Sequence, residues 1–505
     1  MMGRLRASKF VFVCLIFCAS VPAHSQTPVK IWWSSEYLPE HPRWFTNPPA
    51  PSEIRHRLDR LPDQNFGEIG PSGELPVFQI NPQKSLQEIL GIGTSLEATT
   101  IYAIRKNKTD AQMREVLKAL IDPINGLGFN LFRITIGTSD FSDGRSVSQH
   151  PKGYYTYQDD ENAPFSIQND IDLNIISTLK LAQEVAASLE PPREILFFAS
   201  CWSPPAWMKT SNNLICGTLK KGYEKRLARY FRNFVEAYQT QGIPIYAMTM
   251  QNEPNFLPAE YPGMKLTPAQ ERDLVIATYE EFADTTGGKK TLDVKLWIND
   301  HNFDNWQNAD TVLTGLEQLG KKYYVDATAF HNYTDAPASN MTLLHERHPA
   351  KRIVFTEHSE WGVAGMYNLQ QYFWNWSTSY MYWVTMSTQK LDEHNQGPYN
   401  RLGELSPTLF IQEDGASPEW YKTPEVYLIS QFSRFIQRGA RRIDCERGSP
   451  EFVTLIAFEN PDESFIAIMV NQTNREQRFK LRFEGRELEC ALPLKTAGTY
   501  VWRRE

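Results

Sequence analysis

Residues 245–255 read Ile-Tyr-Ala-Met-Thr-Met-Gln-Asn-Glu-Pro-Asn, an apolar run that ends abruptly in polar side chains. Apolar residues at consecutive positions are typical of a strand in a parallel sheet that is covered on both faces. Segments of this kind recur along the chain, and the stretches between them carry apolar residues at the three and four spacing of amphipathic helices. The apolar runs lie at 89–95, 129–137, 194–200, 245–250, 294–300, 325–333, 352–358 and 380–386.

Eight strand and helix units in about 300 residues predict an α/β fold, a (β/α)8 TIM barrel over residues 86–435. An open, doubly wound sheet that binds a nucleotide is the alternative. Its one cue is Gly91-Ile92-Gly93, and this cue fails because Leu96 stands where the third glycine is needed.

The segments on either side of the barrel have a different character. After residue 435, strands alternate without helices, which predicts a smaller C-terminal antiparallel β-sandwich over 436–505. Residues 26–85 are rich in proline and irregular, but 28–33 and 76–80 look extended and are expected to contribute strands to the sandwich.

Residues 1–25 have the features of a secretory signal peptide. Arg4, Arg6 and Lys9 precede an apolar run over 10–19, and small residues follow at 21–23. We therefore expect an exported protein, secreted or periplasmic.

Composition argues against several classes of partner. The 505-residue chain has 52 basic and 59 acidic residues, a net charge of -7, and it lacks the basic footprint that nucleic acid or an anionic membrane requires. No segment after the signal has the length and apolarity of a membrane-spanning helix. No Cys or His spacing suggests a metal site, so we expect neither metal nor cofactor. The four cysteines after the signal are compatible with disulfides or with free thiols: Cys201, Cys216, Cys445 and Cys490.

Two carboxylates end apolar runs on nearly opposite sides of the predicted barrel. Glu253 follows the fourth run and Glu357 the seventh, and active sites of such barrels lie at these strand ends. Two carboxyl groups that face each other across a sugar are the machinery of a retaining glycosidase. Glu360 is a rival for the second role, but it lies further along the loop.

The motifs around these strand ends make the chain resemble glycoside hydrolase family 30, which includes glucosylceramidases and β-1,6-glucanases. The resemblance covers nearly all of the chain after the signal. It rests on Phe129-Asn130-Leu131-Phe132-Arg133, on Ser139-Asp140-Phe141-Ser142, on the run Ala199-Ser-Cys-Trp-Ser-Pro-Pro-Ala-Trp-Met-Lys-Thr210, and on Asn252-Glu253-Pro254. Cys201 stands where the family usually has proline.

The resemblance implies a role for each site residue. Glu253 would be the acid/base and Glu357 the nucleophile. Arg133 would support Asp140 and Glu253 from below, and His331 with Tyr333 would line the site near the nucleophile. The residues that would hold the non-reducing sugar are Asp140, Trp202, Asn252 and Trp383. The family's Gly-Pro-Asn segment is Gly397-Pro398-Tyr399-Asn400 here, so its asparagine contact is shifted to Asn400 or lost.

We therefore expect a retaining β-glycosidase that hydrolyses β-glucosidic bonds by double displacement. The mechanism predicts that Glu253 titrates at a higher pH than Glu357. The substrate is a β-linked saccharide or a glycolipid, either a β-1,6-glucan or a glucosylceramide-like lipid. Activity on a β-fucoside, β-galactoside or β-xyloside is the alternative within the family.

Two hypotheses belong to other classes. A catalytically inactive carbohydrate-binding barrel would explain the aromatic residues but not the two carboxylates. A metal-dependent hydrolase would use His301, His331 and His358.

Overall fold

The computed structural model of the protein describes residues 28–37, 53–70, 73, 75–142, 144–148, 150, 152–390, 394–397 and 408–504. The expected signal peptide and Asn400 lie outside these residues. An eight-stranded parallel sheet forms the barrel, and all eight predicted strands are confirmed. They are β6 (Gly91–Ser95), β7 (Leu131–Thr135), β8 (Leu196–Ser200), β9 (Ile245–Thr249), β10 (Lys295–Asn302), β11 (Ala327–His331), β12 (Arg352–Glu357) and β13 (Ser379–Tyr382).

The barrel closes between its first and last strands in the sheet order, β12 and β13. The N–H of Thr378 donates to the carbonyl of Ile353 at 2.9 Å, and the N–H of His358 donates to the carbonyl of Met381 at 3.2 Å. The TIM-barrel prediction is therefore confirmed.

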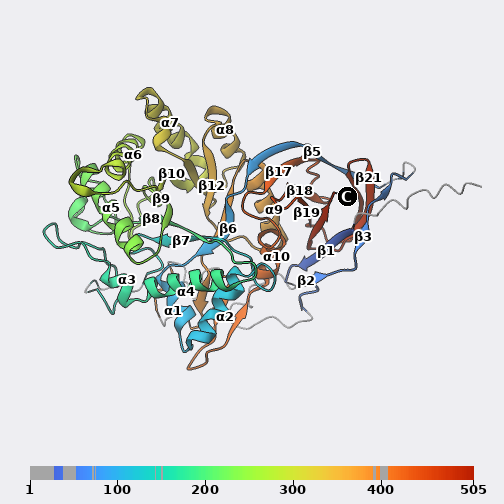
Figure 1. The fold of residues 1–505 in the computed structure, drawn as a ribbon, viewed down its shortest axis with the longest axis horizontal. Coiled ribbons are helices and arrows are strands. Elements are labelled where there is room, and N and C mark those ends of the chain that lie inside the picture. The colour runs from blue at the N-terminus through green and yellow to red at the C-terminus, as the bar shows by residue number, and fades with distance from the viewer. Residues whose placement is uncertain are drawn as a thin grey trace, which may run out of the picture.

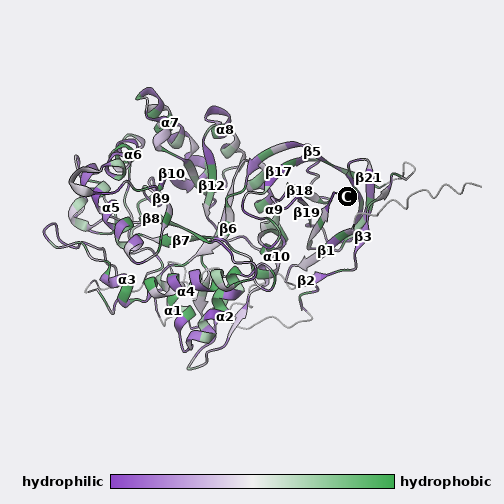
Figure 2. Ribbon diagram, in the orientation of Figure 1, coloured by the Kyte–Doolittle hydropathy of each residue, from purple (hydrophilic) through white to green (hydrophobic). Residues whose placement is uncertain are grey.

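Helices cover the outside of the barrel (Figure 1). They are α1 (Ala98–Arg105), α2 (Asp110–Ile121), α3 (Gln168–Asp172), α4 (Ile175–Ser188), α5 (Glu224–Thr240), α6 (Pro268–Ala283), α7 (Trp306–Gln318), α8 (Ser339–Arg347), α9 (Gly362–Trp374) and α10 (Pro424–Ser433). The start of α2 is fixed by a reciprocal cap, in which Thr109 and Gln112 each accept the other's backbone N–H. Figure 2 shows hydrophilic and hydrophobic residues along single helices such as α4, as expected for helices with one buried face.

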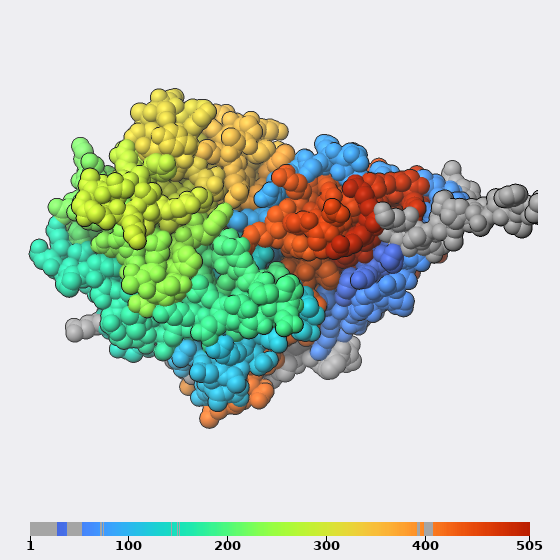
Figure 3. Space-filling model, viewed as in Figure 1, coloured from blue at the N-terminus to red at the C-terminus, as the bar shows by residue number. Residues whose placement is uncertain are grey.

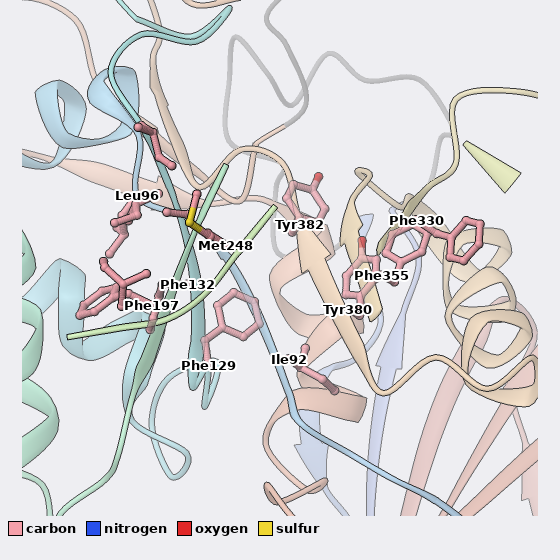
Figure 4. Packing of buried hydrophobic residues seen from close by; sticks show 14 of the residues in the cluster. Ile92, Leu96, Phe129, Phe132, Phe197, Met248, Phe330, Phe355, Tyr380 and Tyr382 are labelled. Atoms are coloured by element: carbon pink, nitrogen blue, oxygen red, sulfur yellow. The ribbon is translucent and has the colours of Figure 1, made fainter. Parts of the chain in front are cut away.

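Alternation along the barrel strands sorts their apolar side chains into two cores. Outward-pointing residues such as Phe132, Phe197 and Phe355 pack in the large cluster drawn in Figure 4. Inward-pointing residues fill the barrel: Leu90, Leu131, Phe198, Ala247, Trp297, Ala327, Ala329, Val354 and Met381. One inward step further along five of the strands, the side chains become polar: Arg133, Ser200, Thr249, His331 and Thr356. The apolar filling therefore ends in a buried polar layer at the C-terminal ends of the strands.

Gly93 lets β6 approach β7 closely. A Cβ atom at this position would lie 1.6 Å from the carbonyl oxygen of Leu131. The Gly91-Ile92-Gly93 sequence thus serves strand packing in a barrel, and the nucleotide-binding alternative is wrong.

The rest of the protein is a β-rich part built on an 11-stranded sheet. Its strands are β1 (Pro28–Ser35), β2 (Arg57–Arg60), β3 (Gln64–Asn65), β4 (Gly67–Glu68), β5 (Val77–Glu88), β17 (Arg441–Cys445), β18 (Thr454–Glu459), β19 (Ser464–Asn471), β20 (Gln477–Phe483), β21 (Arg486–Leu492) and β22 (Thr496–Arg503). N-terminal strands take part, since β1 pairs with β22 and β5 with β17. Figure 3 shows these blue segments beside the orange and red C-terminal ones.

One pairing in this part departs from the predicted antiparallel arrangement, because β20 runs parallel to β5. A parallel pair needs a long connection. Here the whole barrel lies between the two strands in the sequence, so the requirement is met. A further small sheet holds β14 (Met386–Thr388), β15 (Phe410–Gln412) and β16 (Trp420–Lys422).

Two helices join the barrel to the β-rich part. Gln431 of α10 donates to Ser34 Oγ at 2.7 Å and accepts from Thr499 Oγ1 at 2.6 Å. Gln370 of α9 accepts from Thr454 Oγ1 at 2.6 Å and donates to the carbonyl of Ile468 at 3.0 Å. These buried hydrogen bonds of the two glutamine side chains hold the sandwich against the side of the barrel.

Two further features bear on the sequence predictions. Cys201, Cys216, Cys445 and Cys490 are free thiols in this structure. In the part of the chain that is described, no helix combines the length and the apolar character needed to cross a membrane.

Candidate active site

Asp300, fully buried at the end of β10, lies at the centre of the polar layer. Its Oδ2 atom accepts hydrogen bonds from Arg133 Nη2 at 2.9 Å, Ser200 Oγ at 3.1 Å and Thr249 Oγ1 at 2.7 Å. Its Oδ1 atom accepts from Thr356 Oγ1 at 2.6 Å and faces His331 Nε2 at 3.0 Å. These partners come from β7, β8, β9, β12 and β11, so one carboxylate ties together five other strands of the barrel.

A local irregularity in β10 points Asp300 inward. Asn299 and Asp300 have φ angles of +72° and +43°, and the pairing with β11 shifts register here. Strict alternation from the inward Trp297 would have pointed Asp300 outward, towards the helices. Glu271 of α6 stabilises the irregularity by accepting the N–H of Asn299 at 2.7 Å. The polar run 299–302 was the only sequence signal for this residue, and the sequence analysis did not use it.

Arg133 connects Asp300 to two predicted site residues. Its Nη2 atom also donates to Asn252 Oδ1 at 2.8 Å, and its Nη1 atom donates to the Glu357 carboxylate. Among the described residues no hydrogen bond joins Arg133 to Asp140 or Glu253, the two residues that the resemblance implied it supports, but the charge of Arg133 opposes the rise in the pKa of Asp140. The guanidinium is a rigid planar fork, and its donors are directed at Asp300, Asn252 and Glu357.

Glu357 ends β12 and is buried between two donors. Besides Arg133, it accepts from the Tyr333 hydroxyl at 2.9 Å. Tyr333 is 43 % exposed as a residue while its hydroxyl contacts the buried Glu357, so this residue reaches from the surface to the carboxylate. Both donors favour the ionised form of Glu357 that a nucleophile requires.

The rival carboxylate, Glu360, is occupied elsewhere. It pairs with His358 Nδ1 at 2.8 Å, and it accepts from Asn368 Nδ2 at 2.9 Å and from the Tyr372 hydroxyl. In the described part of the chain, the group of possible metal ligands that contains His301 and His331 has Glu253 as its third member and does not include His358, so the structure does not bring the three predicted histidines together.

Glu253 follows β9 in a left-handed conformation, with φ at +50°. Its N–H donates to the carbonyl of Asp300 at 3.0 Å. Its Oε1 atom faces two imidazoles, His331 Nδ1 at 3.5 Å and His301 Nδ1 at 3.7 Å. His331 therefore stands between Glu253 on one side and Asp300 on the other.

The charges of this cluster set the pKa values of its members. Burial opposes protonation of His331, but Glu357, Asp300 and Glu253 raise its pKa to about 9. Burial raises the pKa of Glu253, yet His331 and His301 outweigh burial and the net shift is downward. Burial raises the pKa of Glu357 more than His331 and Arg133 lower it.

The expected order, with Glu253 titrating above Glu357, is therefore reversed in the free protein. The physical reason is the position of the charged His331. Its Nδ1 atom lies beside Glu253, while Glu357 is more deeply buried and also feels the negative charge of Glu253.

The two predicted sugar-binding tryptophans form a buried stack. The rings of Trp202 and Trp383 lie 5.3 Å apart at 22°, and the Arg133 guanidinium lies 4.7 Å from the Trp202 ring. Phe141 meets Trp383 edge-on at 5.5 Å. The stack thus forms an aromatic wall behind the Arg133 and Glu357 pair.

Asp140 carries an unsatisfied group, since its buried Oδ1 atom has no hydrogen-bond partner. Burial, together with Glu357 and Glu253, raises the pKa of Asp140 well above its usual value. A buried polar atom without a partner is costly unless something completes it. Asp140 is therefore suited to receive a hydroxyl group of a ligand.

A second buried carboxylate supports the segment that carries Asp140. Asp170 accepts hydrogen bonds from three hydroxyls, those of Tyr155 at 2.7 Å, Tyr157 at 2.6 Å and Tyr238 at 2.6 Å. The Tyr157 oxygen in turn accepts the N–H of Gly137 at 2.8 Å, three residues before Asp140. This cluster was not predicted from the sequence.

Comparison with known proteins agrees with this geometry. The model of the glycosyl hydrolase family 30 TIM-barrel domain matches residues 89–436, and that of the family's β-sandwich domain matches residues 439–500. Putative glucosylceramidase 2 of Caenorhabditis elegans is 28 % identical over 417 residues, 78 % of this chain and 76 % of the relative. An endo-1,6-β-D-glucanase of Neurospora crassa is 28 % identical over 378 residues, 71 % of this chain and 72 % of the relative.

Solved structures agree in fold. The endo-β-1,6-glucanase BT3312 superposes with a TM-score of 0.76 at 23 % identity, covering 94 % of this chain and 99 % of that one. SrfJ from Salmonella typhimurium gives a TM-score of 0.78 at 21 % identity, covering 95 % and 100 %. At these identities the superpositions support the fold alone, but the family models span the barrel and the sandwich. The chain is a glycoside hydrolase and belongs to glycosyl hydrolase family 30.

Proposed function

We propose that the protein is a retaining β-glycosidase that cleaves β-glucosidic bonds, with Glu357 as nucleophile and Glu253 as acid/base. The observation that carries this proposal is the pair of strand-end carboxylates with unlike surroundings. Glu357 receives two strong donors, Arg133 and Tyr333, whereas Glu253 faces only imidazoles. Glu357 is thus held by two donors that favour its ionised form against burial, and Glu253 lies beside imidazoles with which it can exchange a proton.

The reaction proceeds in two displacements. A Glu357 oxygen attacks the anomeric carbon, the bond to the leaving oxygen breaks, and Glu253 gives that oxygen a proton. Glu253 then takes a proton from water, whose oxygen attacks the anomeric carbon and releases Glu357. The configuration is inverted twice and therefore retained.

His331 supplies the proton in this scheme. In the free protein its pKa of about 9 keeps it charged beside Glu253, and among its neighbours the negative charge of Glu357 raises this pKa most. As Glu357 forms the glycosyl bond it loses its charge and His331 becomes more acidic, so the His331 proton passes through Glu253 to the leaving oxygen as that bond breaks. Glu253 is thereby left ionised and serves as the base in the second step, in which the proton taken from water returns to His331. The reversed pKa order of the two glutamates is thereby compatible with the mechanism.

The remaining predicted residues bind the sugar. Asp140 receives hydroxyl groups through its unpartnered Oδ1 atom, and Trp202 with Trp383 forms the apolar wall. Asn252, whose oxygen is bound to Arg133, keeps its amide N–H groups for the 2-hydroxyl.

The test is hydrolysis of a panel of aryl β-glycosides and of β-1,6-glucan, with Glu357→Gln, Glu253→Ala and Glu360→Gln beside the wild type. Glu357→Gln should abolish turnover, and Glu360→Gln, the matched control three residues away, should retain it. Glu253→Ala should lose most activity on poor leaving groups and keep more on activated ones, which need no proton.

Azide, added as an external nucleophile, distinguishes the nucleophile from the acid/base. In Glu253→Ala the glycosyl bond to Glu357 still forms, and azide attacking it from the opposite face gives a β-glycosyl azide. In Glu357→Ala azide takes the nucleophile's place and gives the α-glycosyl azide. The reverse pattern of products would refute the two assignments.

A glycolipid is a second candidate substrate, favoured by one observation. Phe256 and Leu257 follow Glu253, the proposed acid/base, by three and four residues and are 44 % and 43 % exposed. The double variant Phe256→Ser/Leu257→Ser should reduce hydrolysis of glucosylceramide and leave that of an aryl β-glucoside intact. An equal loss on both substrates would exclude this role.

We further propose that the protein is exported, on the strength of the basic and apolar N-terminal residues. N-terminal sequencing of the protein recovered outside the cytoplasm should begin near residue 26. Recovery of the uncleaved chain in the cytoplasm would refute export.

A further inference from the structure

Two buried imidazole nitrogens next to Glu253 have no hydrogen-bond partner. They are His301 Nδ1 and His331 Nδ1, on side chains that are 8 % and 0 % exposed. Together with a Glu253 carboxylate oxygen they form a group of three possible ligand atoms, all within 4.8 Å of one another. Both nitrogens are directed towards the same carboxylate.

The spacing fits a tetrahedral divalent metal ion. Ligand bonds of about 2.0–2.1 Å at a tetrahedral angle place ligand atoms about 3.3 Å apart. Glu253 Oε1 lies 3.5 Å from His331 Nδ1 and 3.7 Å from His301 Nδ1. Small side-chain movements would therefore bring the three atoms into coordination.

The surroundings of His331 are those of a metal ligand. A coordinating imidazole commonly donates its second N–H to a carboxylate, which fixes the ring and makes its free nitrogen more basic. Asp300 Oδ1 plays this part at 3.0 Å from His331 Nε2. Asp300 is itself held by Arg133 and three hydroxyls, so the ring orientation is fixed before any ion arrives.

We propose that Glu253, His301 and His331 form a binding site for a divalent transition metal ion such as Zn²⁺, and that the bound ion inhibits the enzyme. Two imidazoles and one carboxylate are ligands that such ions prefer. Binding displaces the proton from His331 Nδ1. It also occupies the Glu253 oxygen, so the leaving group receives no proton. The inhibition rests on the function proposed above, whereas the binding of the ion does not.

Binding is measured first, by calorimetric titration of ZnCl₂ into chelator-treated, dialysed full-length protein. The wild type should bind one equivalent. His301→Gln should weaken binding by at least about tenfold, because even outer partners of metal ligands contribute ten- to a hundredfold. Cys216→Ser, which removes a half-buried thiol outside the group, is the matched control and should bind as the wild type does. Glu253→Gln should weaken zinc binding as His301→Gln does. It therefore provides a second test of the site if one of the two variants does not fold.

Inhibition is measured next, with each variant compared with its own zinc-free rate on an aryl β-glucoside. The zinc concentration for half inhibition should rise in His301→Gln by the same factor as its dissociation constant. Absence of zinc binding, or equal binding by His301→Gln and wild type, overturns the site. Activation by zinc, or loss of activity after chelation, overturns inhibition in favour of a cofactor. Zinc binding at the site without hydrolysis of any glycoside supports the site and refutes the proposed function.

Discussion

Replacing Asp300 by asparagine should destabilise the barrel far more than a conservative change usually does. Asp300 is the acceptor for Arg133, Ser200, Thr249 and Thr356 and the partner of His331. Asparagine keeps the shape of the side chain but has one acceptor oxygen and no charge. Its NH₂ group must face either Arg133 or His331, so one charged hydrogen bond is lost in either orientation.

The size of the effect follows from burial. A hydrogen bond to a charged group contributes about 1.5–3 kcal/mol, and removing one partner of a buried ion pair costs about 3–5 kcal/mol. The two figures describe the same loss, so the expected destabilisation is about 3–5 kcal/mol. The same substitution at Asp326 is the control. Asp326 accepts from Trp297 Nε1 at 3.1 Å and lies 3.8 Å from Arg352, and both members of that ion pair are partly exposed. Such a pair contributes about 0.2–1 kcal/mol.

The assay is urea unfolding of wild type, Asp300→Asn and Asp326→Asn at pH 7, followed by tryptophan fluorescence. Asp300→Asn should unfold at a clearly lower urea concentration than Asp326→Asn. Its kcat should fall on the order of a hundredfold, because both Arg133 and His331 lose the group that positions them.

The pH dependence gives a second check. Burial would raise the pKa of Asp300, but Arg133 and His331 hold it well below the usual 3.8. A carboxylate with a lowered folded pKa contributes fully above its unfolded pKa, and the contribution is lost as the pH falls through the folded pKa. The titration of Asp300 itself therefore adds no pH dependence to the difference between wild type and Asp300→Asn from about pH 7 to about pH 5. Asp300 also helps to raise the pKa of His331 to about 9, and the stability that this shift contributes is fully present only below the unfolded pKa of about 6.5, so the difference should grow somewhat as the pH falls from 7 to 5. If Asp300→Asn is no less stable than Asp326→Asn, the five contacts do not support the barrel and the reasoning is refuted.

Three further variants test other parts of the structure. His331→Gln removes the charge that opposes burial at Glu357, so the acid limb of the kcat/KM profile should move to higher pH; it also removes the imidazole of pKa about 9 that holds the proton, so the alkaline limb should move to lower pH, and an unmoved alkaline limb would contradict the role of His331 as proton donor. Asp170→Asn should raise KM more than it lowers kcat on an aryl β-glucoside, because Asp170 holds the segment that carries Asp140; a fall in kcat alone would contradict this. Gly93→Ala should cost about 3 kcal/mol or more in urea unfolding, whereas Gly70→Ala, whose added Cβ meets nothing within 4 Å, should cost little; equal stability would contradict the close approach of β6 and β7.

The barrel strands could be predicted because each is buried on both faces and is therefore mostly apolar up to the polar layer at its C-terminal end. The placement of Glu253 and Glu357 followed from the same pattern, since a polar residue directly after such a strand must lie at the mouth of the barrel. Each of these inferences uses one segment at a time. That is why they did not depend on knowing the register between strands.

The features that sequence analysis missed depend on register and on distant partners. Asp300 points inward only because β10 is irregular at Asn299, and Glu271 supports this irregularity from a helix earlier in the chain. The hydrogen-bond partners of Arg133 were not predicted because they are set by how β7 faces β10 and β12 across the barrel. No pattern within a single segment contains that information.

The polar layer also explains why the barrel carries buried charges at all. Replacing a buried ion pair by well-packed apolar residues is often neutral or stabilising, so stability alone would favour extending the core of Trp297 and Val354 upwards. Such a core would leave Glu357 without Arg133 and His331 without Asp300. Each of the two strand-end carboxylates would then lose the neighbour that sets its charge. We therefore interpret the cluster around Asp300 as a support for Glu253 and Glu357. The five side chains that contact Asp300 offset the free-energy cost of burying its charge.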